Sequence, residues 1–471
     1  MAVACCSALA THCPGLAISL PGSAAYNLTE ASYWSLQESN LQPSCIITPS
    51  VPHEAASAVQ VLVSNPACEH VEFAIKGRTH APAGGFANNN GGVTIDMTGM
   101  STVTVNDDHS LASVGAGASW LDVYAYLDPL GKSVAGGRNG AVGVGGLTLG
   151  GGISYFSPQV GFTCDTLVNM ELVLASGELV NANSTSHPNL FRALKGGTNN
   201  FGLVTRFDFT TVPISKILAG GLVNDISHRS AVFSAFAGIA GAKHYDVHAS
   251  IVVGLLFNST SNTWVLSSTP IYTLPELRPK VYEPLFAVPN ISDTLEIAAL
   301  HVFANESATP PLNWQFWTGT YGVSANLLDK MFDAINTTLY SFDIPEGILW
   351  DIAFEPLPTV FTAPGALKNS LGTSPSDGNS VVMLLSALWP DSASNGKVHK
   401  RAAEVVSAVN EVAKEMGLEK EFVYANYADW SQQPFESYGE ESVRFLKKTA
   451  RKYDEHGVIQ RKVPGGFKLS G

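Results

Sequence analysis

Short apolar runs alternate with glycine-rich stretches through the first half of the chain. Three strands are expected there, at residues 71–75, 93–97 and 113–116. Residues 168–181 predict a β-hairpin, because two apolar runs flank a Ser-Gly turn. A short helix is expected around residues 189–194, and Gly196 and Gly197 would end it.

From about Ile214 the pattern changes to longer alternating segments with fewer glycines. Strands are expected at 247–257, 264–272 and 381–389, and a helix at 325–340. Residues 398–416 carry apolar side chains at helical spacing, and Gly417 would stop that helix. The pattern therefore predicts a separate domain with an antiparallel sheet flanked by helices, followed by a tail of strand, loop and helix.

The composition is that of a globular protein. Charged residues make up 14% and hydrophobic residues 45% of the 471-residue chain. The net charge of −13 argues against a nucleic-acid partner or an anionic membrane surface. No stretch of the sequence approaches 18 uninterrupted apolar residues, so we expect no membrane span.

The six cysteines have no CxxC spacing and no histidines at zinc spacing, so no metal site is expected. Four of them lie within the first 45 residues. One or two disulfides that fasten the N-terminal segment are the favoured interpretation, with Cys6–Cys45 as the first pairing. The alternative is a set of reduced, buried thiols.

Six Asn-x-Ser/Thr sequons are compatible with a secreted glycoprotein. They lie at Asn27, Asn183, Asn258, Asn290, Asn305 and Asn336. The first six residues lack a basic region and a long apolar core, so an exported protein would have a signal peptide that is absent from this sequence. If this N-terminus is native, a cytoplasmic location is expected instead.

Glycine is concentrated in one part of the chain: residues 77–152 contain 18 of the 43 glycines. Two segments stand out, Lys76-Gly77-Arg78-Thr79-His80 and residues 142–152. Neither is a GxxxxGK[ST] loop, and neither fits a GxGxxG that is followed by a helix. Two interpretations remain, tight loop packing or a pair of loops whose N–H groups hold a pyrophosphate.

The combination of motifs resembles the berberine-bridge-enzyme-like branch of the vanillyl-alcohol-oxidase superfamily of FAD-linked oxidases. The two glycine-rich segments match the family's motifs, as does Gly91-Gly92-Val93-Thr94-Ile95-Asp96-Met97. Further matches run from Asp165 to Val173, from Gly196 to Thr205, from Tyr424 to Tyr427 and from Lys452 to Asp454. The resemblance therefore covers most of the chain.

The fold that the resemblance implies is α+β. It comprises a PCMH-type FAD-binding domain of two α/β lobes and a substrate domain whose antiparallel sheet is backed by helices. The expected boundaries are an N-terminal segment at 1–40, the FAD domain at 41–213, the substrate domain at 214–411 and a returning C-terminal segment at 412–471. We expect a monomer or a homodimer.

By the same resemblance, the imidazole of His80 bonds the 8α-methyl group of the flavin. Arg78 and Thr79 replace the family's paired glycines, and a positive φ at either residue would be strained. Asn139 stands where some relatives have a second, cysteinyl attachment, so a single link is expected. Val142 falls where relatives control oxygen access, which favours an oxidase.

The cofactor-binding residues that the resemblance predicts lie in five places. They are Lys76, Gly77, Arg78, Thr79, His80, Ala81, Asn88, Val142, Gly143, Gly146, Leu147, Thr148, Gly150, Gly151, Gly152, Gly202, Val204 and Asn426. The catalytic candidates are Tyr424, as the first choice for the base, with Glu355 and Tyr427. On a strand, Tyr424 and Asn426 would share one face and Tyr427 would point away. The alternative is that the tyrosines pack in the core and Glu355 is solvated.

The expected reaction is hydride transfer from a substrate C–H to flavin N5, with reoxidation by oxygen to hydrogen peroxide. The substrate is a small molecule, and a secondary-metabolite alcohol or amine is favoured over a carbohydrate. A second hypothesis is an FAD-containing cyclase or pericyclic catalyst of a biosynthetic pathway. A third is an FAD-binding protein without catalysis.

Overall fold

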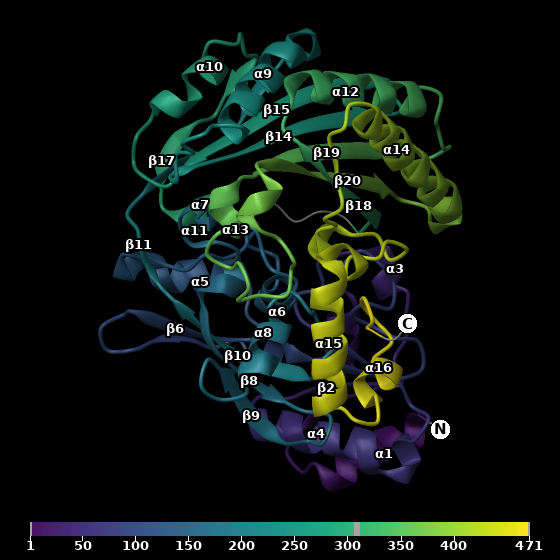
Figure 1. Ribbon diagram of the computed structural model, residues 1–471. Helices are drawn as coiled ribbons and strands as arrows, with labels where there is room; N and C mark the ends of the chain where they lie inside the picture. Colours follow the sequence, from purple (N-terminus) through teal and green to yellow (C-terminus); the bar gives the residue numbers. More distant parts are fainter. Residues whose placement is uncertain (1, 306–310, 470–471) are drawn as a thin grey trace.

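The computed structural model describes residues 2–305 and 311–469, and Figure 1 shows two tiers of sheet and helix, one above the other. The lower tier begins with a small sheet in the order β1-β2-β4-β3. Its strands are β1 (Ala17–Ser19), β2 (Cys45–Thr48), β3 (Phe73–Lys76) and β4 (Val93–Asp96). Strands β2, β4 and β3 are parallel, and α4 (Pro52–Ser64) makes the crossover between β2 and β3.

A second sheet completes the lower tier, in the order β5-β6-β10-β8-β9. Its strands are β5 (Val103–Val105), β6 (Leu111–Gly115), β8 (Leu167–Val173), β9 (Leu179–Asn183) and β10 (Leu203–Thr210), paired antiparallel. The β8–β9 pair is the predicted hairpin, and α8 (Pro188–Leu194) is the predicted short helix. Both predictions are confirmed.

The upper tier is one large antiparallel sheet, whose main path runs β16-β13-β15-β14-β19-β20-β18-β21. The long strands are β14 (Ala249–Asn258), β15 (Thr263–Tyr272), β18 (Asn313–Gly322), β19 (Leu349–Leu357) and β20 (Ser380–Trp389). The short ones are β13 (Leu222–Asn224), β16 (Ser292–Asp293) and β21 (Glu419–Lys420). The predicted strands and the antiparallel pairing are confirmed.

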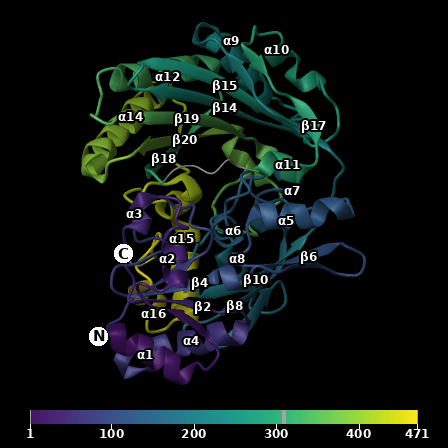
Figure 2. The ribbon, with the colours of Figure 1, turned by 180° about the vertical axis from the view of Figure 1, so that it is seen from behind.

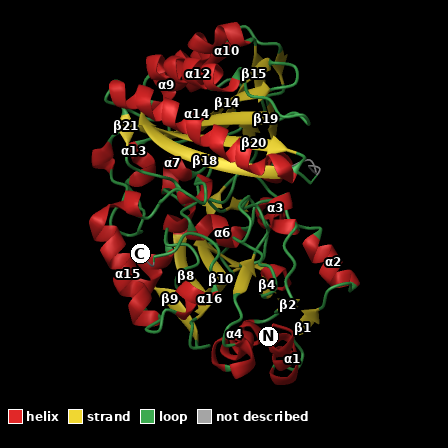
Figure 3. Cartoon of the chain, turned by 90° about the vertical axis from the view of Figure 1, so that its right-hand side faces the viewer, coloured by secondary structure: helices red, strands yellow, loops and turns green. Residues whose placement is uncertain are grey.

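Long helices cover the outer face of this sheet (Figures 1 and 3). They are α9 (Arg229–Ala240), α12 (Ala325–Leu339) and α14 (Asn395–Glu415). Trp350, Ile352 and Phe354 of β19 point into the core beneath these helices. Because side chains alternate along a strand, Asp351 and Glu355 lie on the opposite face, toward the lower tier. The tier boundary is therefore lined by the polar face of β19.

The end of the chain returns to the lower tier, where α15 (Gly439–Tyr453) and α16 (Val458–Lys462) pack (Figures 1 and 2). At the other end, α1 (Ala2–His12) is fastened by two disulfides, Cys5–Cys68 and Cys6–Cys45. The predicted Cys6–Cys45 pairing is confirmed, while Cys13 and Cys164 are free and buried. Within residues 2–305 and 311–469, no helix has the length and apolar character to cross a membrane.

Candidate active site

A cavity of about 630 Å³ lies beside the first glycine-rich segment, a volume typical of cofactor sites. Its walls come from the segment around α2 (Ala24–Glu30), from the loop after β3, and from the residues that precede the second glycine-rich segment. The lining residues are Leu28, Thr29, Ala31, Ser32, Tyr33, Trp34, Lys76, Arg78, Thr79, His80, Asp96, Thr98, Ser119, Leu121, Gly140, Ala141, Asn305 and Pro311.

Arg78 and Thr79, which replace the family's glycines, behave differently. Thr79 has a φ of 63°, in the left-handed region that disfavours a β-branched residue, whereas Arg78 is not among the residues with positive φ. The Thr79 hydroxyl donates a hydrogen bond of 3.0 Å to the carbonyl of Ser32, which helps to hold this conformation. Of the two substituted positions, Thr79 therefore has the expected backbone strain and Arg78 does not.

The Arg78 guanidinium is held at the rim of the cavity by two contacts. Its Nε donates to the carbonyl of Gly117 at 2.8 Å, and it forms a 2.9 Å ion pair with Asp122.

At the other end of this segment, burial lowers the pKa of His80 to about 4. The imidazole is therefore neutral at physiological pH, with a nitrogen lone pair available.

The second glycine-rich segment contains a short helix, α6 (Val144–Leu149), so the expectation of a simple loop was wrong. A side chain at Gly146 would meet nothing within 4 Å, and the same is true of Gly77 in the first segment. Each segment therefore exposes bare backbone to open space. The two segments also contact each other, because a Cβ at Gly143 would lie 2.9 Å from the backbone nitrogen of Arg78.

The end of the second segment packs against the C-terminal residues. A Cβ at Gly150 would lie 2.0 Å from Asn426 Oδ1, so only glycine fits there. Asn426 donates 3.0 Å hydrogen bonds to the Leu147 carbonyl and to the Tyr424 hydroxyl. Gly151 and Gly152 both have positive φ, at 112° and 85°.

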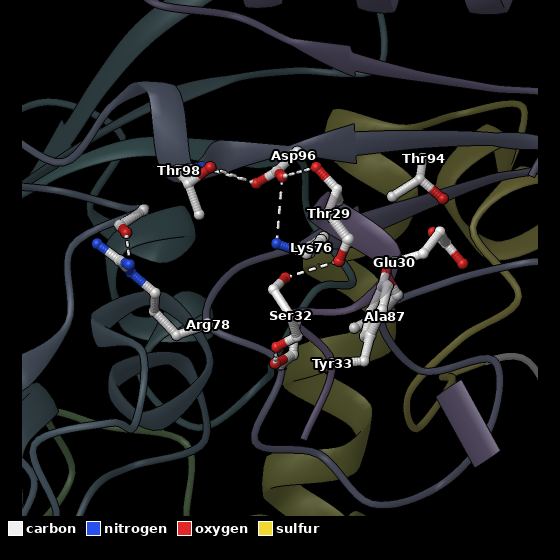
Figure 4. A network of polar contacts seen from close by, with 12 residues as sticks. Thr29, Glu30, Ser32, Tyr33, Lys76, Arg78, Ala87, Thr94, Asp96 and Thr98 are labelled. Atoms are coloured by element: carbon white, nitrogen blue, oxygen red, sulfur yellow. Dashed lines mark hydrogen bonds and ion pairs between the residues drawn. The ribbon is translucent and has the colours of Figure 1, made fainter. Parts of the chain in front are cut away.

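A polar network next to the cavity joins the α2 segment to β3 and β4 (Figure 4). Lys76 forms a buried 3.1 Å ion pair with Asp96, whose carboxylate also accepts a hydrogen bond from Thr29. Asn88 is fully buried and donates to Glu30 at 3.2 Å. Asn88 thus serves this network and does not line the cavity. Desolvation raises the pKa of Glu30 to about 7.

We expect this buried carboxyl group to make stability depend on pH. The pKa of Glu30 is about 4.5 in the unfolded chain and about 7 in the folded protein, so the folded state holds the proton more tightly. This contribution to stability is complete below pH 4.5 and is lost as the pH rises through about 7. Raising the pH from 5 to 8 should therefore lower the midpoint of thermal unfolding of the wild type by about 2 °C more than that of Glu30→Gln. The control is Glu69→Gln, at a glutamate 71% exposed, and equal pH dependence in all three proteins would contradict the prediction.

A second group of polar side chains lies at the boundary between the tiers. Arg138 forms a 2.7 Å ion pair with Glu355 Oε1 and a hydrogen bond with the Tyr427 hydroxyl. Tyr427 in turn donates to Glu355 Oε1 at 3.0 Å. Glu355 is only 3% exposed, so it is not the solvated residue of the alternative interpretation. Among the described residues, its Oε2 is buried without a hydrogen-bond partner.

The two tyrosines do not lie on a strand. Residues Ala425–Tyr427 form a single 3-10 turn, so the predicted opposite orientation of Tyr424 and Tyr427 was wrong. Their rings contact each other edge to face, with centroids 4.9 Å apart. Burial raises the pKa of both hydroxyls, which therefore remain protonated at neutral pH unless a ligand changes their surroundings.

The structure brings some predicted site residues together and leaves others apart. Lys76, Arg78, Thr79 and His80 line the cavity, while Tyr427 and Glu355 meet at Arg138. The cavity is not lined by the other predicted cofactor residues, which are Gly77, Ala81, Asn88, Val142, Gly143, Gly146, Leu147, Thr148, Gly150, Gly151, Gly152, Gly202, Val204 and Asn426. Gly202 has a φ of 147° against the Val173 carbonyl, and Val204 pairs with Leu172 in the second sheet. The interpretation of the sequence missed Trp34 and Arg138, whose positions become clear only when distant segments meet.

The donor set fits a flavin dinucleotide. Bare backbone at Gly77 and Gly146 allows close approach of a diphosphate, and basic side chains line the cavity. The Thr148 hydroxyl is buried and has no hydrogen-bond partner among the described residues, so its hydrogen-bonding capacity is unused. These residues therefore suit the cofactor that the sequence motifs imply.

Comparisons with known proteins identify an FAD-binding domain and relatives of the same fold. A family model described as "FAD binding domain" matches residues 43–183. The FAD-dependent monooxygenase sdcF of Emericella nidulans is 34% identical over 473 residues, which cover 99% of this chain and 98% of the relative. The 6-hydroxy-D-nicotine oxidase of Arthrobacter nicotinovorans has a TM-score of 0.80 at 20% identity, covering 97% and 98% of the two chains.

Another structure of the same fold is the glucooligosaccharide oxidase of Acremonium strictum, with a TM-score of 0.77 at 20% identity and 97% coverage of both chains. That protein is described as carrying a 6-S-cysteinyl, 8α-N1-histidyl FAD. The fold and the site thus define an FAD-dependent oxidoreductase of α+β architecture. The chain belongs to the same family of FAD-dependent enzymes as sdcF, and its fold is that of a berberine-bridge-enzyme-like protein of Physcomitrella patens, with a TM-score of 0.77 at 18% identity and 99% coverage of both chains.

Proposed function

We propose that the protein is an FAD-dependent oxidase that removes hydride from a C–H group of a small alcohol or amine and passes the electrons to oxygen, forming hydrogen peroxide. When bound, the flavin supplies the hydride acceptor. The loop after β3 and the second glycine-rich segment would hold this cofactor, and His80 would carry it covalently. The observation on which the proposal rests is the buried Oε2 of Glu355 at the boundary between the tiers, which has no hydrogen-bond partner in residues 2–305 and 311–469.

We assign the role of base to Glu355, with Tyr427 as its hydrogen-bonding partner. An oxidation at carbon needs a group that takes the companion proton from the substrate O–H or N–H. Oε1 of Glu355 is occupied by Arg138 and Tyr427, which leaves Oε2 as the acceptor. Tyr424 is a weaker candidate, because burial raises the pKa of its hydroxyl and Asn426 already donates to it.

The polar inner face of the upper sheet supports a substrate with hydroxyl or amino groups. Asp351 lies on the same face of β19 as Glu355, and burial, followed by the charge of Glu355, raises its pKa to about 6. Ser386, the partner of Asp351 in β20, adds a hydroxyl on that face. Phe316 of β18 contributes an aromatic ring that contacts Tyr427.

A second candidate function is monooxygenation, which the name of sdcF favours. The two reactions share the cofactor and differ in the fate of oxygen. An oxidase releases one hydrogen peroxide for each substrate consumed, whereas a monooxygenase transfers one atom of labelled oxygen to its product. Quantifying peroxide and product mass after turnover in ¹⁸O₂ distinguishes them.

Passage through the secretory pathway is part of the proposal. Two disulfides are typical of proteins that fold in an oxidising compartment. The sequon asparagines Asn27 and Asn290 are exposed and accessible to glycosylation.

The covalent attachment is tested by acid precipitation of the purified protein. We expect the yellow colour of the wild type to remain in the pellet, and we expect the flavin of His80→Ala to move entirely to the supernatant. His244→Ala removes an exposed histidine and should behave like the wild type. Colour in the wild-type supernatant would disprove the link but not FAD binding, and colour in the His80→Ala pellet would place the attachment elsewhere.

A further inference from the structure

Trp34 lies in the cavity wall between α2 and α3 (Leu36–Ser39), against the proposed attachment residue. Its indole stacks on the imidazole of His80, with a centroid distance of 4.2 Å and an interplanar angle of 17°. Trp34 also stacks with Trp314 of β18, at 3.9 Å and 26°. The three rings therefore form a continuous stack from the lower tier to the upper one.

The backbone on both sides of Trp34 is fastened to the His80 loop. The Thr79 hydroxyl donates to the carbonyl of Ser32, and the Ser35 hydroxyl donates 3.0 Å to the carbonyl of Pro82. These two bonds link residues on either side of Trp34 to residues on either side of His80. The strained conformation of Thr79 is thus part of the connection that places the two rings face to face.

The same segment is also fastened to the edge of the upper sheet. Leu36 donates its N–H to the Leu312 carbonyl at 2.9 Å. The Gln37 amide makes two hydrogen bonds with the backbone of Trp314, at 2.8 and 3.1 Å. Trp34 is therefore held from two directions, and it presents a fixed flat surface to the imidazole.

We propose that Trp34 is a positioning residue for covalent attachment of the flavin to His80, an inference that rests on the proposed function. Stacking on the indole disfavours rotation of the imidazole out of its plane, while both ring nitrogens stay at its edge. Both His80 and Trp34 line the cavity, so the stacked pair is accessible to a cofactor bound there. Bonding then requires no search among side-chain rotamers of His80.

The attachment step balances without any external catalyst. A C–N bond forms between an imidazole nitrogen and the 8α carbon of the flavin, while the imidazole loses its N–H proton and the 8α carbon loses one C–H proton. The two electrons remain on the flavin, which takes up the two protons and becomes reduced. Molecular oxygen then reoxidises it and is itself reduced to hydrogen peroxide.

Three variants test the role of Trp34, and the measurement is the fraction of total flavin that stays in the acid pellet. Trp34→Phe keeps an aromatic face and should retain at least about 80% of the wild-type fraction, since stacking needs only a flat ring. Trp34→Leu keeps apolar volume without a ring and should fall at least about fivefold, because the imidazole regains its rotamers. Trp430→Ala removes an indole that is 59% exposed and stacks on His399, and it should match the wild type.

Total bound flavin and the thermal midpoint are measured on the same samples, so that a loss of folding or of FAD affinity is recognised separately. A wild-type fraction in Trp34→Leu would overturn this inference and leave the His80 link intact. Equal losses in Trp34→Phe and Trp34→Leu would also overturn it, because a flat ring would then be irrelevant. A wild type without acid-stable flavin would overturn the proposed attachment and this inference together.

Discussion

Glu355→Gln is expected to slow flavin reduction by about 10²- to 10⁴-fold, the range usual for loss of a general base. The amide keeps the volume of the side chain but cannot take a proton from the substrate. Of the two carboxylate oxygens, only Oε2 is free of protein partners among the described residues, so this acceptor has no evident substitute. The rate of anaerobic bleaching of the flavin, by a substrate that bleaches the wild type, is the measurement.

Two variants accompany this experiment as matched controls. Asp351→Asn changes a carboxylate on the same strand and the same face, and Tyr424→Phe removes the other candidate base. We expect reduction rates within about tenfold of the wild type for both, since neither takes the proton. A slow Tyr424→Phe together with a fast Glu355→Gln would transfer the role of base to Tyr424.

Much of the fold follows from patterns that are local in the sequence. Alternating apolar residues mark β14, β15 and β20, and helical spacing with a terminal glycine marks α14. The Ser-Gly turn marks the β8–β9 hairpin. These elements could be predicted because each is specified by its own residues, and partners elsewhere in the chain only confirm the choice.

The turn at Ala425–Tyr427 shows where such reasoning fails. The residues alternate as they would on a strand, but Asn426 bonds the Leu147 carbonyl of a segment 279 residues away. This tertiary contact overrides the local pattern and turns both tyrosine rings toward each other. Helix α6 is a similar case, because its glycines have low helix propensity and only their surroundings make them helical.

The polar group of the site illustrates the same limit. Glu355 and Tyr427 were candidates on the basis of the motifs around them, but nothing in the sequence pairs either with Arg138. The contact joins three distant parts of the chain: Arg138 just before the second glycine-rich segment, Glu355 in β19 and Tyr427 in the C-terminal turn. Arg138 and Glu355 are 217 residues apart, and Glu355 and Tyr427 are 72 residues apart. A buried ion pair between distant residues becomes evident only from coordinates.

This ion pair leads to the second large effect, on stability. Arg138→Met removes the guanidinium and leaves the Glu355 carboxylate, 3% exposed, without a cation. Removing one member of a buried pair typically costs about 3–5 kcal/mol, because the remaining charge stays desolvated. We therefore expect a clearly lower midpoint of thermal unfolding for Arg138→Met than for the wild type.

The double variant Arg138→Met/Glu355→Gln separates this cause from a simple loss of packing. Replacing the carboxylate with a neutral amide removes the unpaired charge, so the double variant should regain about 1–3 kcal/mol relative to Arg138→Met, a coupling energy usual for residues in contact. Its catalytic rate should nevertheless remain as low as that of Glu355→Gln, because the proton acceptor is still missing. If the two losses of stability simply add, the charge of Glu355 is compensated by groups other than Arg138, and the guanidinium serves only to pack the boundary between the tiers.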